Sequence, residues 1–382
     1  MNSPVDRARA LGEEILAARQ EMERSRHLPS SLSEQFRDAQ LYRLCIPRLY
    51  GGLEASPRTI VESIEALAEA DASAAWCVMI SATTGALGAY LDSSEAGAIF
   101  QDPHLAIAGV YAPMGKATVE GDSYRISGQW KWNSNGHNAT WLCGGCVVYE
   151  NDAPRMLNDK VPEHRMMIFP ANEVAFVDTW HTAGLRGTGS GDFVVSNLLV
   201  PRSRSVSLIT DKPRITTPLY AFPIFGLLAI GIAAVASGNA QAALKDFAVH
   251  AGSKRTPAGR MLNDRGFVQA TYADASARLH AARALLFAEI DKSWAEAQTN
   301  SDISLVERAG LRLAATHMTR TAAEVVRIVQ DLAGGASVFI NDPLCRRLAD
   351  AQAMTAHIMI APATYELTGR ALLGVPLSAS EL

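Results

Sequence analysis

The amino-acid sequence predicts an α+β fold in three domains: a helical domain over residues 1–103, a β domain over 104–209 and a second helical domain over 210–382. Apolar residues recur at i, i+3 and i+4 in the first segment, and long alanine-rich stretches with the same spacing fill the third. The middle segment instead shows strand-like alternation. Because the strands are segregated from the helices, the pattern indicates α+β rather than alternating α/β.

Two helices are expected in the later part of the first segment. Residues 59–70 form the first, and Pro57 lies near its start. Residues 74–91 form a very apolar second helix, for which Asp71 and Ser73 provide a plausible N-terminal cap. Its composition predicts a buried helix.

The middle segment carries the strand signals. Residues 118–128, TVEGDSYRISG, alternate around a Gly-Asp turn, which is typical of a β-hairpin. Further strands are expected over 130–149, 165–176 and 192–200.

The third segment returns to helices, which are expected over residues 222–251, 266–297, 304–332 and 350–373. Residues 222–236 are the longest apolar run, but about 15 residues interrupted by Pro and Gly are too few to span a bilayer comfortably. We therefore expect a buried helix there and a block of four helices overall.

Composition narrows the possible functions. The chain has 382 residues, 48% hydrophobic and 19% charged, with a net charge of −4 and a pI near 6.2. These values give no electrostatic basis for binding nucleic acid or an anionic membrane. Three acidic residues within the first 20 argue against a signal peptide, and five cysteines do not make a disulfide framework. We expect a cytoplasmic protein.

Two motifs carry the chemistry: WNSNGHNATW (residues 132–141) and DTWHTAGLRGTGSGDFVVSNLLVP (residues 178–201). Each combines aromatic residues with a turn rich in glycine and hydroxyl groups beside a strand. On a strand, Trp132 and Ser134 would share one face, so that a flat apolar wall lies beside a small polar group. This combination suits a planar cofactor that forms hydrogen bonds.

These motifs and three longer stretches resemble the acyl-CoA dehydrogenase superfamily. Residues 36–52 are similar to its N-terminal helical hairpin, residues 110–141 to its flavin-facing strands, and residues 330–350 to its C-terminal turn. The resemblance covers nearly the whole chain. It implies an N-terminal helical domain, a central β-barrel and a C-terminal four-helix bundle, with a flavin between barrel and bundle.

The resemblance also implies the residues that contact the flavin. Trp132, Ser134, Trp180 and Thr188 match positions near the ring, and Ser134 is expected to form a hydrogen bond at flavin N5. The C-terminal turn reaches the flavin of a neighbouring subunit, which implies a homo-oligomer, typically a tetramer. The residues expected to make these distal contacts are Arg255, Gln330, Gly334, Gly335 and Arg346. Ala349 replaces the family's arginine before Asp350, which leaves FMN and FAD both open.

His357 is the expected catalytic residue. A dehydrogenase has its catalytic glutamate near this position, seven residues after Asp350, whereas Glu366 comes two turns too late and is expected on the surface. The oxygenase branch of the superfamily carries a histidine here, and imidazole can exchange protons near neutral pH. We expect the substrate to lie against an apolar wall of aromatic side chains: Trp76, Tyr90, Tyr220, Phe222 and Phe225.

The sequence thus predicts a reduced-flavin-dependent monooxygenase that hydroxylates an aromatic or polycyclic small molecule through a flavin C4a-hydroperoxide. Reduced flavin (FMNH2 or FADH2) would come from a separate reductase, because no strand is followed by a nicotinamide-binding G-x-G-x-x-G. O2 would be the co-substrate. Two alternatives remain open: an FAD-dependent acyl-CoA dehydrogenase, and a non-catalytic assembly protein with the same fold.

One other feature suggests chemistry but is better explained otherwise. Cys143 and Cys146 form a CxxC pair, yet on a strand they would face opposite sides, and no second pair completes a metal site. We expect inert cysteines and no metal. His181, beside Trp180, is the second candidate for a catalytic histidine.

Overall fold

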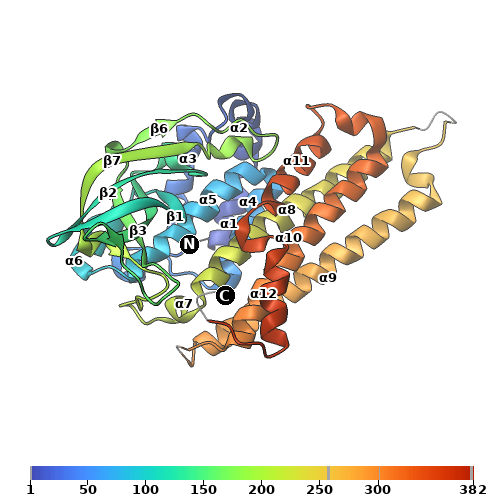
Figure 1. Ribbon diagram of the computed structural model, residues 1–382. Helices are drawn as coiled ribbons and strands as arrows, with labels where there is room; N and C mark the ends of the chain where they lie inside the picture. Colours follow the sequence, from blue (N-terminus) through green and yellow to red (C-terminus); the bar gives the residue numbers. More distant parts are fainter. Residues whose placement is uncertain (1, 256–258, 301, 379–381) are drawn as a thin grey trace.

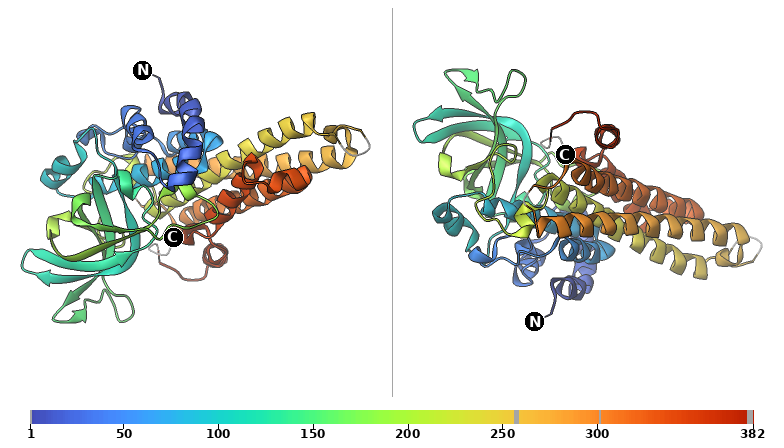
Figure 2. Two further views of the ribbon diagram at one scale, coloured as in Figure 1. Left: turned by 90° about the horizontal axis from the view of Figure 1, so that it is seen from above. Right: turned by 90° about the horizontal axis from the view of Figure 1, so that it is seen from below.

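The computed structural model describes residues 2–255, 259–300, 302–378 and 382. Six helices are followed by eight strands and then by six further helices in this described part of the chain. In Figures 1 and 2, the β domain and the far end of the long C-terminal helices lie at opposite ends of the molecule, and several of the N-terminal helices lie between them. The α+β architecture predicted from the sequence is confirmed.

The N-terminal domain provides one buried helix that faces the site. Helix α5 (Ala72–Thr84) begins where the Asp71 carboxylate accepts hydrogen bonds from the Ser73 and Ala74 N–H groups, as predicted. The predicted helix to residue 91 is too long, because the backbone tightens into the 3-10 segment η3 (Gly85–Ala89). The other helices are α1 (Pro4–Ala10), α2 (Gly12–Ser25), α3 (Ser30–Asp38), α4 (Pro57–Ala70) and α6 (Ser93–Phe100).

The β domain is one mixed sheet with the strand order β6-β7-β2-β1-β3-β5-β8, and β4 pairs with β3. Strands β6 and β8 lie at the two ends of this order and each pairs with one neighbour, and the mixed sheet is the central β domain that the sequence predicted. The strands are β1 (Ile107–Glu120), β2 (Ser123–Trp130), β3 (Trp141–Glu150), β4 (Ala153–Pro154), β5 (His164–Pro170), β6 (Ala175–Val177), β7 (Asp192–Pro201) and β8 (Ser205–Val206).

The predicted hairpin is present, since Glu120 pairs with Ser123 across the Gly-Asp turn. The expected strand over residues 130–149 is interrupted between β2 and β3. Trp130 fills the centre of the sheet's own core, where its ring stacks on Phe193 with centroids 4.9 Å apart.

The C-terminal domain consists of three long helices and a broken fourth. Helix α8 crosses α4 closely, because Gly238 has no side chain to meet the Glu65 carbonyl. The helix expected over residues 350–373 is interrupted between Thr355 and Ala363, where Pro362 disfavours continuation of the helix. The helices are α7 (Pro218–Ala221), α8 (Ile224–Ser253), α9 (Gly266–Ala297), α10 (Leu305–Ala333), α11 (Pro343–Thr355) and α12 (Ala363–Leu372).

Two segments, Ala72–Ala89 and Ile224–Ser253, are long and apolar enough by composition to cross a membrane. In both, 89% of the apolar window is buried inside the protein. This burial is that of core helices, as the sequence predicted for the apolar run in α8.

Candidate active site

Side chains from all three domains meet at one buried corner where the domains join. Trp76 on α5 donates its indole N–H to the Ser134 hydroxyl of the β domain, at 3.0 Å. The same indole packs edge-on against the His357 imidazole of the C-terminal domain, with ring centroids 5.8 Å apart. The sequence singled out each of these residues separately, and the fold brings them together.

Ser134 lies in a turn rather than on a strand. Strand β2 ends at Trp130, and Trp132 has a left-handed backbone with φ 67°. The two side chains therefore do not share a strand face: Trp132 is 60% exposed, whereas Ser134 is 5% exposed. The prediction of a shared face was wrong for this reason. A left-handed bulky residue is costly and indicates that the surrounding structure holds the indole at the surface.

Asn133, between these two residues, is buried, and neither polar atom of its side-chain amide has a hydrogen-bond partner among the described residues. An unsatisfied buried amide costs about 1–3 kcal/mol. The turn thus offers an exposed flat ring, an amide without partners and a buried hydroxyl. These groups fit a planar molecule rich in nitrogen and oxygen, as a flavin is.

Three hydroxyl groups form a chain that leads away from Ser134. The Ser134 hydroxyl lies 2.6 Å from that of Ser190, and the Ser190 hydroxyl lies 2.6 Å from that of Thr188. Thr188 donates to the main-chain carbonyl of Leu185 at 2.8 Å. All three hydroxyl-bearing residues are buried.

The turn at Leu185 anchors this chain. Its carbonyl also accepts the indole N–H of Trp180 at 2.9 Å, and its N–H donates to the Asp350 carboxylate at 2.6 Å. Leu185 itself is buried with a left-handed φ of 51°. Burial, and then the charge of Asp71, raises the pKa of Asp350 to about 7. Trp180 and Thr188 therefore belong to the hydrogen-bond network of Ser134.

His357 lies in the break between α11 and α12, not on a helix as predicted. Its Nδ1 accepts the Met359 main-chain N–H at 3.2 Å, which places the proton of the neutral ring on Nε2. Burial, with the charge of Arg312 as the second cause, lowers the pKa of His357 to about 4. At neutral pH the imidazole is uncharged and carries one N–H donor.

The predicted substrate residues divide into two groups. Trp76 lies at the corner with His357, and Phe225 packs on Tyr111 with ring centroids 5.4 Å apart. Tyr220 instead donates its hydroxyl to the Cys45 carbonyl at 3.1 Å. Tyr220 and Phe222 are both buried in the main core.

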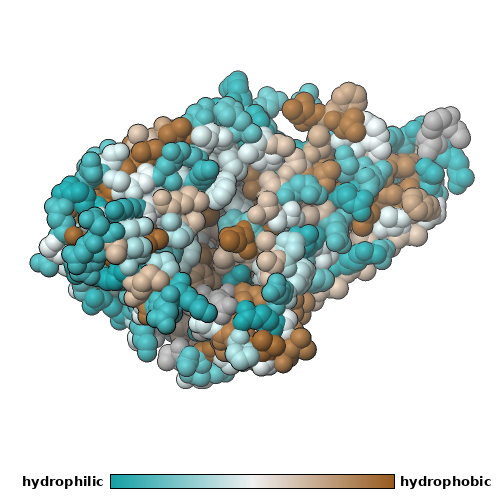
Figure 3. Space-filling view, viewed as in Figure 1, coloured by the Kyte–Doolittle hydropathy of each residue, from teal (hydrophilic) through white to brown (hydrophobic). Residues whose placement is uncertain are grey.

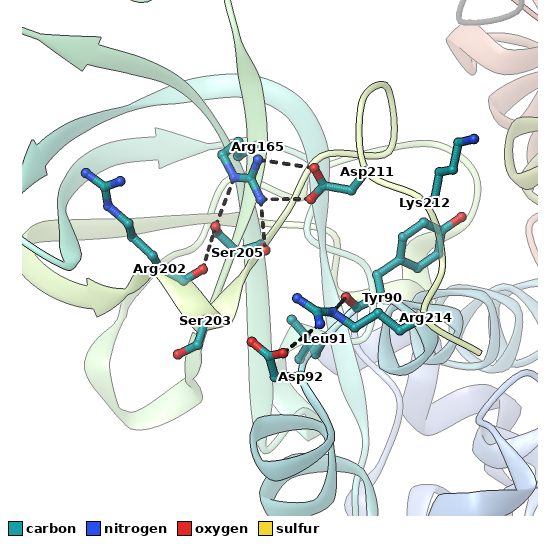
Figure 4. A pocket seen from close by; sticks show the side chains of 10 residues that line it. All are labelled: Tyr90, Leu91, Asp92, Arg165, Arg202, Ser203, Ser205, Asp211, Lys212 and Arg214. Atoms are coloured by element: carbon teal, nitrogen blue, oxygen red, sulfur yellow. Dashed lines mark hydrogen bonds and ion pairs between the residues drawn. The ribbon is translucent and has the colours of Figure 1, made fainter. Parts of the chain in front are cut away.

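Tyr90 lines a separate polar pocket of about 370 Å³ (Figure 4). There the Arg165 guanidinium binds the Asp211 carboxylate, at 2.8 Å, and Arg214 pairs with Asp92, also at 2.8 Å. A pocket lined by ion pairs does not suit an aromatic substrate, because such sites are mostly apolar. Figure 3 shows a different hollow, between the β domain and the segment that joins α11 to α12. His357 belongs to that segment, between Thr355 and Ala363.

The residues expected at the distal part of the flavin, from Arg255 to Gly335, lie at the end of the helical bundle. Lys254, next to Arg255, donates to the Ala333 carbonyl at 2.5 Å, so the basic loop after α8 and the Gln330–Gly335 turn are neighbours. The Gln330 side chain donates to the Ser337 carbonyl at 3.3 Å, and Gly334 ends α10 with φ 66°. In Figure 1 this end of the bundle is remote from the β domain. One chain therefore does not bring Ser134 and Arg255 to the same flavin.

Arg346 does not lie with this distal group but near the Leu185 turn, since its charge acts on Asp350, which holds that turn. It pairs with the Asp71 carboxylate at 2.6 Å and with Glu23 at 3.3 Å. Its charge is balanced inside its own subunit, where it connects α11 to the start of α5.

The two cysteines and Glu366 lie as the sequence predicted, whereas His181, the second candidate for a catalytic histidine, lies away from the His357 corner. Cys143 and Cys146 are both buried but pack in different apolar clusters on the two sides of β3. Burial raises the pKa of the Cys143 thiol to about 12, which makes it inert. Glu366 is exposed, and His181 lies at the surface beside Arg26 and Asp178.

Four residues of this site were not identified from the sequence: Asn133, Leu185, Ser190 and Asp350. Ser190 belongs to the glycine-rich turn and lies two residues after Thr188. Its hydroxyl could therefore have been predicted to lie near that of Thr188. Leu185 and Asp350 could not be found, because they are 165 residues apart and meet only in the fold.

Comparison with known proteins agrees with the resemblance noted in the sequence. Residues 5–96 match the family described as "Acyl-CoA dehydrogenase, N-terminal domain", and residues 230–362 match "Acyl-CoA dehydrogenase, C-terminal domain". The crystal structure of 3-HSA hydroxylase from Rhodococcus sp. RHA1 superimposes with a TM-score of 0.90 at 23% identity. The alignment covers 99% of this chain and 98% of that one.

Curated relatives show which kind of enzyme within this family the chain is similar to. Indole-3-acetate monooxygenase from Pseudomonas putida is 30% identical over 355 residues, which is 93% of this chain and 89% of the relative. The oxygenase component of FADH2-dependent resorcinol hydroxylase from Rhizobium sp. is 26% identical over 392 residues, 97% of this chain and 94% of the relative.

The chain therefore belongs to the acyl-CoA dehydrogenase superfamily, and within it to the flavin-dependent monooxygenases that use reduced flavin and O2. The curated relatives thus favour the monooxygenase over the dehydrogenase and over a non-catalytic assembly protein.

Proposed function

We propose that the protein is the oxygenase component of a two-component system and hydroxylates an aromatic small molecule. The observation that carries this proposal is the meeting of His357, Trp76 and Ser134, each from a different domain, at one buried corner. The names of the curated relatives, which act on indole-3-acetate and resorcinol, support an aromatic substrate. Reduced flavin would come from a separate reductase.

Reduced flavin, when bound, activates O2 for transfer of one oxygen atom to the substrate. Ser134 would form a hydrogen bond with the ring, and the exposed indole of Trp132 would lie against it. The left-handed backbone of Trp132 and the unpartnered amide of Asn133 support this assignment, because both are costly without a ligand.

His357 would act beside the substrate. As a neutral ring with its proton on Nε2, it holds one N–H donor in a fixed orientation. Such a pre-oriented donor stabilises charge that develops on oxygen in the transition state. Trp76 and the aromatic residues around Phe225 would exclude water and accept the flat face of the substrate.

The complete flavin site would be shared between subunits of a homo-oligomer, which we propose to be a tetramer. Arg255, Gln330, Gly334 and Gly335 lie too far along the bundle to serve Ser134 of the same chain, so they would serve a neighbour. Next to them, Phe339 is 68% and Ile340 is 84% exposed. Exposed apolar residues of this kind mark protein interfaces. The flavin would be FMN or FAD. Arg346, which is paired with Asp71 and Glu23, would contribute to the site by holding α11 to the start of α5. The enzyme would be soluble and cytoplasmic.

The proposal is tested by supplying reduced flavin from any NADH-dependent flavin reductase in air, with indole-3-acetate and resorcinol as first substrates. We expect a product heavier by one oxygen atom, detected by mass spectrometry. Desaturation of an acyl-CoA under anaerobic conditions with a dye acceptor, without any oxygenated product, would instead identify a dehydrogenase.

A further inference from the structure

The direction of every hydrogen bond in the chain from Ser134 follows from its last member. Each hydroxyl has one proton and two lone pairs. The Leu185 carbonyl can only accept, so the proton of Thr188 is used there. Thr188 must then accept from Ser190 across the 2.6 Å contact. Ser190, in turn, must accept from Ser134, at 2.6 Å.

This order leaves Ser134 with no proton to offer. Its own proton goes to Ser190, and one of its lone pairs accepts the indole N–H of Trp76. Among the described residues nothing binds the other lone pair. Ser134 therefore presents a hydrogen-bond acceptor, and only an acceptor, to a bound ring.

The two redox states of a flavin differ at the atom concerned. Oxidised flavin has an unprotonated N5 that requires a donor, whereas reduced flavin carries N5–H and requires an acceptor. We propose that Ser190 and Thr188 are positioning residues that fix Ser134 as an acceptor and so make the site selective for reduced flavin. The inference rests on the proposed function, which places flavin N5 beside Ser134.

The terminal carbonyl is well suited to fix this order. Leu185 is held in a left-handed conformation, with its N–H bound by Asp350 and its carbonyl bound by Trp180. If the hydroxyl protons pointed the other way, Thr188 would donate to Ser190 instead of to the Leu185 carbonyl. That buried carbonyl would then lose one of its donors. The contact between the Thr188 hydroxyl and this fixed carbonyl therefore sets the direction of the three hydroxyl protons.

The test measures the ratio of dissociation constants for oxidised and reduced FMN and FAD, titrated anaerobically on the same variant. In the native protein we expect reduced flavin to bind at least 10-fold more tightly. Ser190→Ala frees the proton of Ser134, and Thr188→Val frees that of Ser190, which can then donate towards Ser134. Each change should lower the ratio by about 10-fold, the value of one hydrogen bond. Thr188→Ser keeps the hydroxyl and should keep the ratio.

If a substitution weakens flavin binding through a general loss of packing, both dissociation constants rise by the same factor. Their ratio then stays unchanged, because both redox states are titrated on the same variant. An unchanged ratio in Ser190→Ala and Thr188→Val would overturn the proposal while leaving the monooxygenase assignment intact. The proposal is also overturned, and the monooxygenase assignment again stands, if the native protein binds both redox states equally and still hydroxylates its substrate. If neither state binds, the flavin assignment itself fails, and this inference fails with it.

Discussion

His357 has a buried imidazole whose ionisation is displaced far from neutrality. The sequence suggested a proton exchange near pH 7, but burial lowers the pKa of this group to about 4. The imidazole is therefore neutral above about pH 5, and it does not gain or lose a proton near pH 7. Hydroxylation should show no ionisation of His357 between pH 5.5 and 8. A step near pH 6.5 in the native rate profile that vanishes in His357→Asn would contradict this account.

Removing the imidazole should uncouple oxygen use from hydroxylation. We expect His357→Ala to lower the rate of product formation by about 100- to 1,000-fold, the usual loss for one pre-oriented donor. Oxygen consumption should continue, with hydrogen peroxide replacing the product. Both are measured in one assay with an oxygen electrode and peroxide detection. Normal product yield would show that His357 is a packing residue.

The Ser134 hydroxyl should control the same balance. Ser134→Ala removes a buried acceptor and leaves the Trp76 indole N–H without its partner. A buried unsatisfied group costs about 1–3 kcal/mol, so peroxide leakage should rise roughly 5- to 150-fold. Ser203→Ala, at the separate polar pocket, is the matched control and should leave the coupling unchanged. Unchanged coupling in Ser134→Ala would remove its assigned role.

At the scale of elements, the Leu185 turn is held to α11 through a carboxyl group that titrates near pH 7. Asp350 has a pKa of about 7 in the folded state, well above its ordinary value, because it is buried near Asp71. The folded protein therefore binds more protons than the unfolded chain between about pH 4 and 7, so its stability falls as pH rises through that range. Asp350→Asn should flatten this slope in melting temperatures from pH 5 to 8. An unaltered slope would show that Asp350 is ionised throughout.

Other elements show what the sequence could and could not supply. The hairpin at Gly121-Asp122, the cap at Asp71 and the buried helix α8 follow from local patterns, and they were predicted. The break before α12 carried a signal in Pro362, which was outweighed by the apolar run around it. The exposure of Trp132 had no signal, since a left-handed tryptophan depends on hydrogen bonds made by the turn as a whole.

At the scale of the molecule, the order of the domains and the corner of His357, Trp76 and Ser134 were predictable through the resemblance to a known family. The direction of the hydroxyl chain was not predictable, because it depends on contacts between Leu185 and groups far away in sequence. The same limit applies to Arg346, whose pairing with Asp71 joins residues 275 positions apart.

Assembly should depend on the exposed apolar end of the bundle. Phe339→Glu combined with Ile340→Glu should dissociate the oligomer and weaken flavin binding, because charges are costly in a buried interface. Each subunit should keep its helical content. Leu199→Glu, on the exposed side of β7, is the control and should leave the assembly intact. Sedimentation velocity and flavin titration give both quantities. If the double variant keeps both its oligomeric state and its flavin binding, the interface lies elsewhere.

The central claim is that this protein inserts an oxygen atom from O2 into an aromatic substrate. The most direct measurement is a single turnover of the protein with reduced flavin and 18O2 in ordinary water, followed by mass spectrometry of the product. We predict one 18O atom in each molecule of hydroxylated indole-3-acetate, or of whichever aromatic substrate proves active. Product that carries oxygen only from water, or substrate that is desaturated without gaining oxygen, would contradict the account.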